Sequence, residues 1–165
     1  MKLEININNS PDETHDAQED SDPDIYKNFA EVLGNILPEL YEKAKNYKSA
    51  EISLTFVNSD EIKNLNNDYR NINEPTDVLS FPIELEENLI NMPVLILGDI
   101  IICPEQVKIL HKDLNYTEAI CLMIAHSFLH LIGWDHDTQE KQNLMWQIQD
   151  EIKIKLLNSM KGAEF

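Results

Sequence analysis

Residues 118–132 read EAICLMIAHSFLHLI, and their apolar side chains occupy nearly every side of a predicted helix. A helix of that kind is buried, with neighbours on most of its sides. The stretch falls short of the roughly 20 apolar residues that a membrane span needs, and two histidines interrupt it. We therefore expect residues 117–132 to form the central helix of a globular fold, with Thr117 as its candidate cap.

Three further stretches have apolar side chains at helical spacing, and they cover residues 25–44, 104–113 and 138–158. Pro38 predicts a kink or break in the first helix, because proline lacks the backbone N–H that a regular helix uses. Pro104 suits the first turn of the second helix. Asp137 and Glu140 have the spacing of a capping box for the third.

Four stretches have the alternating or continuously apolar pattern of β-strands, and they cover residues 3–7, 50–57, 77–83 and 93–102. The continuous apolarity of the last two is typical of internal strands. Asn58 and Glu61 predict a capped short helix, and the turn-rich residues 66–76 predict a loop after it. The pattern favours an α+β fold, a small mixed β-sheet flanked by helices, in one domain spanning residues 1–165.

Acidic residues dominate the charge, with 30 Asp and Glu against 13 Lys and Arg and a formal net charge of −17. Such a chain repels polyanions at long range. Residues 8–22 predict a mobile acidic segment, because they have little to bury. Cys103 and Cys121 lack CxxC spacing, which fits a reducing compartment. Without a signal-peptide core or a membrane span, the expected location is the cytoplasm.

A histidine cluster carries the clearest chemistry in residues 126–136, HSFLHLIGWDH. His126 and His130 lie on one face of the predicted helix, so a ring nitrogen of each can point toward the same position. Gly133 can adopt the left-handed conformation that ends a helix, which would bring His136 back toward that point. Three histidines with an open fourth position are typical of a catalytic zinc site. We therefore predict one zinc ion per chain.

Other polar groups near the cluster have less specific patterns. Asp135 and Asp137 could accept hydrogen bonds from the ligand rings, although surface turn residues are the simpler interpretation. His15 and His111 are single and unpatterned, and we expect them at the surface. Histidines that hydrogen-bond within the core are the alternative to a metal site, and the three-histidine spacing around a glycine disfavours it.

Ser127 argues against peptide hydrolysis as the reaction of this site. The histidine spacing is that of the metzincin peptidases, in which the residue after the first histidine is a glutamate that acts as general base. A serine hydroxyl is far too weak a base for that role at neutral pH. Three neutral imidazoles leave the metal most of its +2 charge, which suits an anionic substrate such as a phosphodiester and lowers the pKa of bound water to about 7.

Arg70 is the only arginine of the chain. Its planar guanidinium group can donate two parallel hydrogen bonds to a phosphate group, and it stays charged at all working pH values. The alternative is a salt bridge to one of the many acidic side chains, and charge abundance alone favours that alternative.

Three segments together resemble the YbeY family of bacterial endoribonucleases, also described as ribosomal RNA maturation factors. They are LNNDYRNINEPTDVLSFP (65–82), LGDIII (97–102) and HSFLHLIGWDH (126–136). The resemblance implies metal ligands at His126, His130 and His136 on a zincin-like helix, with Arg70 facing the same site. The family usually has glycine where this chain has Ser127, and neither residue is a carboxylate.

The resemblance also implies an activity and its partners. The expected protein is a metal-dependent, single-strand-directed endoribonuclease of 16S ribosomal RNA 3′-end maturation and ribosome quality control. Because the chain is acidic, RNA binding needs a site made locally positive by the metal, Arg70 and Lys63, or docking on the ribosome or a ribosomal protein. Two alternatives remain: a zinc-dependent peptidase or amidohydrolase, and a non-catalytic ribosome-assembly factor with a structural metal.

Overall fold

The computed structural model of the chain describes residues 1–9, 23–84 and 93–161, and a four-stranded sheet lies at its centre. In spatial order the strands are β1 (Lys2–Asn9), β2 (Ser49–Phe56), β4 (Val94–Ile102) and β3 (Val78–Pro82). β1, β2 and β4 run parallel, whereas β3 is antiparallel to β4. The predicted small mixed sheet flanked by helices is confirmed.

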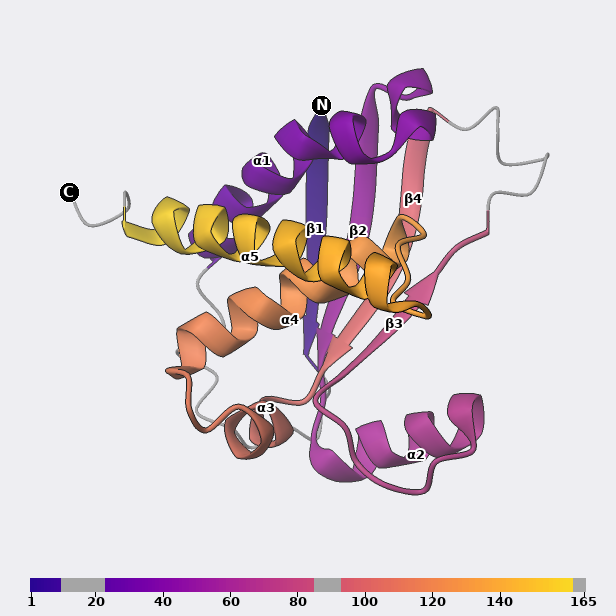
Figure 1. Cartoon of the computed structure of the whole chain (residues 1–165), viewed down its shortest axis with the longest axis vertical. Coiled ribbons are helices and arrows are strands. Elements are labelled where there is room, and N and C mark those ends of the chain that lie inside the picture. Colours follow the sequence, from indigo (N-terminus) through magenta and orange to yellow (C-terminus); the bar gives the residue numbers. More distant parts are fainter. Residues whose placement is uncertain (10–22, 85–92, 162–165) are drawn as a thin grey trace.

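Helices cover one face of this sheet, as Figure 1 shows. The elements on that face are α1 (Pro23–Leu40), α4 (Tyr116–Leu131) and α5 (Gln139–Lys161). The remaining helical elements are η1 (Glu42–Asn46), α2 (Ser59–Arg70) and α3 (Pro104–Leu110). No helix in the described part of the chain is long and apolar enough to cross a membrane.

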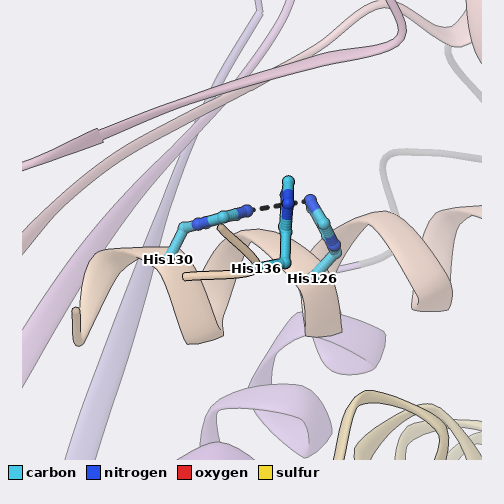
Figure 2. A group of neighbouring side chains, drawn as sticks. All are labelled: His126, His130 and His136. Carbon is cyan, nitrogen blue, oxygen red and sulfur yellow. Dashed lines mark hydrogen bonds between the residues drawn. The ribbon is translucent and has the colours of Figure 1, made fainter. Parts of the chain in front are cut away.

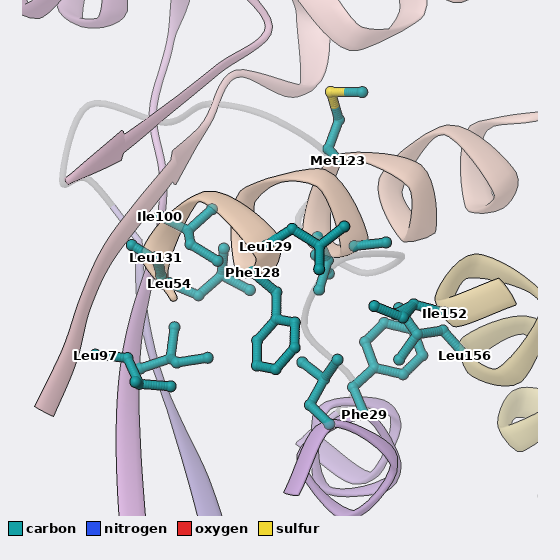
Figure 3. Close-up of a cluster of buried hydrophobic side chains, with 14 of the residues drawn as sticks. Phe29, Leu54, Leu97, Ile100, Met123, Phe128, Leu129, Leu131, Ile152 and Leu156 are labelled. Carbon is teal, nitrogen blue, oxygen red and sulfur yellow. The ribbon is translucent and has the colours of Figure 1, made fainter. Parts of the chain in front are cut away.

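The core forms where α4 meets the sheet, α1 and α5. Phe128 of α4 is fully buried, and Figure 3 shows its ring between the strand residue Leu97 and Phe29 of α1. Ile152 and Leu156 complete this core from α5. The predicted central, almost completely buried helix is therefore confirmed, and the two histidines that it carries are held on a rigid element.

The prediction that residues 77–83 form an internal strand is wrong, because β3 lies at an edge of the sheet. Its apolarity has another cause. Leu79 is buried in a second small cluster with Ile62 of α2, on one face of the strand. Alternate side chains face the other way, and α4 contacts β3 as well. An edge strand that is covered on both faces has the same continuous apolar sequence as an internal strand.

The loop predicted for residues 66–76 begins later than expected, because α2 continues to Arg70. The predicted capping box of Asn58 and Glu61 is confirmed at the helix start. Asn66 is buried and its side-chain amide donates to the Glu74 carbonyl at 2.8 Å, which ties the helix to the following turn. Asn71 then ends the helix with φ 56°, a left-handed conformation that asparagine tolerates.

Three other helix ends can be compared with the predictions. The α1 helix ends at Leu40, earlier than the predicted residue 44 and two residues after Pro38, near which a kink or break was predicted. The cap of α4 is Asn115 rather than Thr117, and it forms a capping box with Glu118. The predicted capping box at the start of α5 is absent, because it is the Thr138 hydroxyl that accepts from the Lys141 backbone N–H at 3.3 Å.

The predicted acidic segment, residues 8–22, is only partly covered by the described residues. Residues 10–22 lie outside the described residues, and Asn8 and Asn9 at its predicted start pair with β2 as part of β1.

Replacing Asn115 with alanine should destabilise the protein by about 1 kcal/mol, because the first turn of α4 loses its side-chain acceptor. Urea denaturation of the two proteins would measure the difference. Asn64→Ala is the matched control, since Asn64 is exposed within α2 and alanine favours a helix interior. A denaturation midpoint that Asn115→Ala leaves unchanged would contradict the cap.

Candidate metal site

Three histidines lie together at the C-terminal end of α4. The Nε2 atoms of His126 and His130 are 3.0 Å apart, and one ligand atom from each of His126, His130 and His136 lies within 4.8 Å of the others. Figure 2 shows the three rings turned toward one another. His126 and His130 are half-buried, whereas His136 is exposed. The site is thus open on the side of His136.

The turn after α4 brings His136 back to the helix. The Gly133 N–H donates to the His130 carbonyl at 3.0 Å, and the Trp134 N–H donates to the Leu129 carbonyl at 2.9 Å. These two bonds form a Schellman motif with glycine in the left-handed position, and Gly133 has φ 91°. The predicted role of Gly133 in ending the helix is confirmed.

Each ring of the α4 pair has a contact on the side away from its neighbour. The Nδ1 atom of His126 is 2.7 Å from Oε1 of Gln149. His130 is hydrogen-bonded to the backbone of Trp134. When each ring donates its proton in this contact, both facing Nε2 atoms keep a lone pair for a metal ion, and in the metal-free structure these two atoms are within hydrogen-bond distance of each other.

This donor arrangement fits a metal ion. Two ligands of a tetrahedral zinc ion lie about 3.3 Å apart when each metal–nitrogen distance is 2.0–2.1 Å, and the two Nε2 atoms are 3.0 Å apart. Two lone pairs at that separation repel each other unless a cation or a proton lies between them. Imidazole nitrogens favour zinc and related transition metals over calcium or magnesium.

Burial lowers the pKa of His130, and the neighbouring His126 and His136 lower it further. The Trp134 contact and the charge of Asp135 act in the opposite direction but do not reverse the shift. The neutral imidazole, which is the form that binds a metal, is therefore favoured at neutral pH.

Arg70 lies on a different element. It is the exposed last residue of α2, and its side chain forms no ion pair or hydrogen bond within the described part of the chain. The salt-bridge alternative thus has no support there. The structure does not bring Arg70 into contact with the three histidines. The preceding Tyr69 packs edge-on against Phe81 of β3, with ring centroids 4.8 Å apart, which fixes this end of α2 on the sheet.

Gly98 lets β3 and the end of α4 approach each other. The register of β2 and β4 shifts near this residue, and its φ is 137°. A Cβ atom there would lie 2.1 Å from the Phe81 carbonyl oxygen and 3.1 Å from the Leu131 side chain. Gly98 therefore allows close packing between Phe81 of β3 and Leu131, the residue that follows His130.

The expectations for other polar residues have different outcomes. His111 is half-buried rather than a surface residue, because its Nε2 lies 2.7 Å from the Asp77 carboxylate. His15 lies outside the described residues. Asp135 accepts from the backbone N–H of His136, and Asp137 pairs with the Lys141 ammonium at 3.0 Å. We find neither aspartate bonded to a ligand ring.

Gln149 is the site residue that sequence reasoning missed. Met145, Ile152 and Leu156 are buried along one side of α5, and Gln149 falls in the same row at helical spacing. A polar amide in an otherwise apolar row is unusual, because a buried polar group needs a hydrogen-bond partner. That interruption is the signal that could have identified the residue.

Comparisons with known proteins agree with the three segments described above. The family model described as Endoribonuclease YbeY matches residues 14–157. A protein named Endoribonuclease YbeY from Thermoanaerobacter sp. (strain X514) is 33% identical over 144 residues, which cover 78% of this chain and 88% of that protein. One of the same name from Acholeplasma laidlawii (strain PG-8A) is 36% identical over 129 residues, covering 77% and 88%.

The fold is also similar to a solved structure. The solution structure of TM1509 from Thermotoga maritima matches with a TM-score of 0.52 and 24% sequence identity. The match covers 98% of this chain and 94% of that one. At this identity the likeness concerns the fold alone.

Proposed function

The chain belongs to the YbeY endoribonuclease family, and from this premise we propose that His126, His130 and His136 hold one zinc ion at which RNA is cleaved. Membership makes the chain a metal-dependent endoribonuclease, a hydrolase that acts in ribosomal RNA processing. One observation carries the proposed metal site: two Nε2 atoms face each other at 3.0 Å while the opposite side of each ring is hydrogen-bonded.

The proposed site suits a phosphodiester better than a peptide. When bound, a zinc ion polarises a phosphoryl oxygen and lowers the pKa of water. The three imidazoles are uncharged ligands, so the site keeps its positive charge for an anionic substrate. Ser127 is fully buried, so the position that supplies the general base in metzincin peptidases offers substrate neither a carboxylate nor an accessible hydroxyl. This disfavours the peptidase alternative.

Arg70 is the proposed catalytic cation. Its exposed guanidinium has no competing acidic partner in the described residues, so it is available to a phosphate oxygen. The proposed role is to stabilise the charge that develops on the phosphoryl oxygens during cleavage. The fixed position of α2, through Tyr69 and Phe81, would present that cation on a rigid support.

The proposed substrate is single-stranded RNA at the 3′ end of 16S ribosomal RNA, and the proposed setting is cytoplasmic ribosome maturation and quality control. A chain with a net charge of −17 has little general affinity for RNA. We propose that the ribosome or a ribosomal protein supplies most of the docking energy, while the metal and Arg70 act locally.

A cleavage assay tests the proposed function. Protein loaded with one equivalent of zinc should cut a single-stranded RNA from the 3′ end of 16S ribosomal RNA, and the same RNA in a duplex should be cut more slowly. Removing the metal with a chelator should stop cleavage, and zinc should restore it. Cleavage that survives complete metal removal would contradict the proposal, and hydrolysis of casein without hydrolysis of RNA would favour the peptidase alternative.

A further inference from the structure

Gln149 reaches the metal site from a second helix. The residue is 9% exposed and lies on the side of α5 that packs against α4. Met145 before it and Ile152 after it are buried in the apolar core. Burying an amide in such surroundings is unfavourable unless hydrogen bonds compensate. We therefore expect the Gln149 side chain to have a specific hydrogen-bond partner.

That partner is His126. Oε1 of Gln149 lies 2.7 Å from Nδ1 of His126. A carbonyl oxygen can only accept, so the proton of the neutral imidazole must be on Nδ1. The lone pair is then on Nε2, which is the atom that faces His130. The opposite amide orientation would place the proton on Nε2 and block the same atom as a ligand.

His130 and His136 do not share this dependence on α5. His130 is oriented by the backbone of Trp134, within its own turn. His136 is exposed, and its backbone N–H is held by Asp135. His126 alone relies on a side chain from another element, 23 residues away in the sequence.

We propose that Gln149 is the positioning residue that holds His126 as the Nδ1–H tautomer and so prepares Nε2 for the metal. This inference rests on the proposed metal site. Hydrogen-bond partners of metal-ligating histidines fix ring orientation and tautomer in this way. Gln149 accepts as a carboxylate would but adds no negative charge, so the positive charge of the site is preserved for an anionic substrate.

The first test needs no metal. Nitrogen-15 NMR of the metal-free protein above pH 8 distinguishes the two tautomers of each histidine. Wild-type His126 should show its proton on Nδ1. In Gln149→Met, which keeps the length of the side chain but has only a weak acceptor, a substantial fraction should move to Nε2. A wild-type His126 protonated on Nε2 would overturn the proposal whatever the variants do.

The second test measures zinc affinity by competition with a chromogenic chelator. Gln149→Met should bind zinc about 10–100-fold more weakly, and Gln149→Glu, which retains an acceptor, should bind it at least as tightly as wild type. Gln147→Met is the matched control, because Gln147 is an exposed glutamine on the same helix, and its affinity should be unchanged.

These outcomes separate this inference from the proposed function. Wild-type protein that binds no divalent ion would remove the metal site itself, although the tautomer of His126 could still be read. Normal zinc affinity and an unchanged tautomer in Gln149→Met would overturn the role of Gln149 and leave the endoribonuclease proposal intact. If Gln149→Met does not fold, the wild-type spectrum and the Gln149→Glu affinity decide.

Discussion

His130→Ala should lose its zinc and its RNA cleavage together. His130 supplies one of three proposed ligands, and losing even an outer hydrogen-bond partner of a ligand costs 10–100-fold in metal affinity, so losing the ligand itself should cost more than about 100-fold. Elemental analysis of the purified variant should give almost no zinc, against one ion per chain in wild type. Cleavage of single-stranded RNA should fall to background.

The fold should survive this substitution. His130 lies in the last turn of α4 and is only half-buried, so alanine removes the ring without opening the fully buried core around Phe128. Circular dichroism and urea denaturation of the metal-free proteins would verify this. His111→Ala is the matched control, because His111 is also half-buried but pairs with Asp77 and is not part of the cluster.

Two results would count against the site. Full zinc content in His130→Ala would mean that the three rings do not hold the ion. Loss of zinc with undiminished RNA cleavage would mean that the metal takes no part in the reaction. The assembly-factor alternative would instead be favoured by a wild-type protein that cleaves no RNA and a variant that still supports ribosome maturation. His111→Ala should keep both the metal and the activity.

Local patterns in the sequence identified the elements that carry the site. The continuous apolarity of residues 118–132 identified the buried helix, since few positions of such a helix can face water. The spacing of His126, His130 and Gly133 indicated a shared face and a helix end because α-helical geometry is fixed. These features depend on residues close together in the chain, which is why sequence alone sufficed.

Features that depend on tertiary contacts could not be read in the same way. Asn66 looks like a turn residue, but its buried amide bonds to Glu74 and extends α2. β3 lies at an edge of the sheet, and its continuous apolarity reflects the helices that cover both of its faces. Gln149 gains its role only when α5 packs against α4. In each case the deciding partner is distant or unpatterned in the sequence.

Arg70→Ala should lower RNA cleavage by about 10²–10³-fold while leaving zinc content unchanged. Removing one group that stabilises developing charge typically has an effect of this size on kcat. The fold should tolerate the change, because Arg70 is exposed and forms no ion pair in the described residues. Tyr69 and Phe81 would still hold the end of α2 against the sheet.

Arg70→Lys distinguishes charge from shape. Lysine keeps the positive charge but not the planar fork, so it should recover only part of the activity. Lys63→Ala is the matched control, since it removes a cation from the same helix, and it should weaken RNA binding modestly without a large fall in kcat. Steady-state kinetics with a single-stranded RNA, together with zinc analysis of each variant, would separate these effects.

The pairing of Arg70→Ala with His130→Ala gives the proposal its sharpest test. If both groups act on one phosphate, the two variants fail for different reasons: His130→Ala lacks the metal, whereas Arg70→Ala retains it and lacks the second positive charge. A fall in zinc content in Arg70→Ala would show that the arginine acts through the fold. Wild-type cleavage in Arg70→Ala would remove it from the reaction and leave the three histidines as the whole of the proposed site.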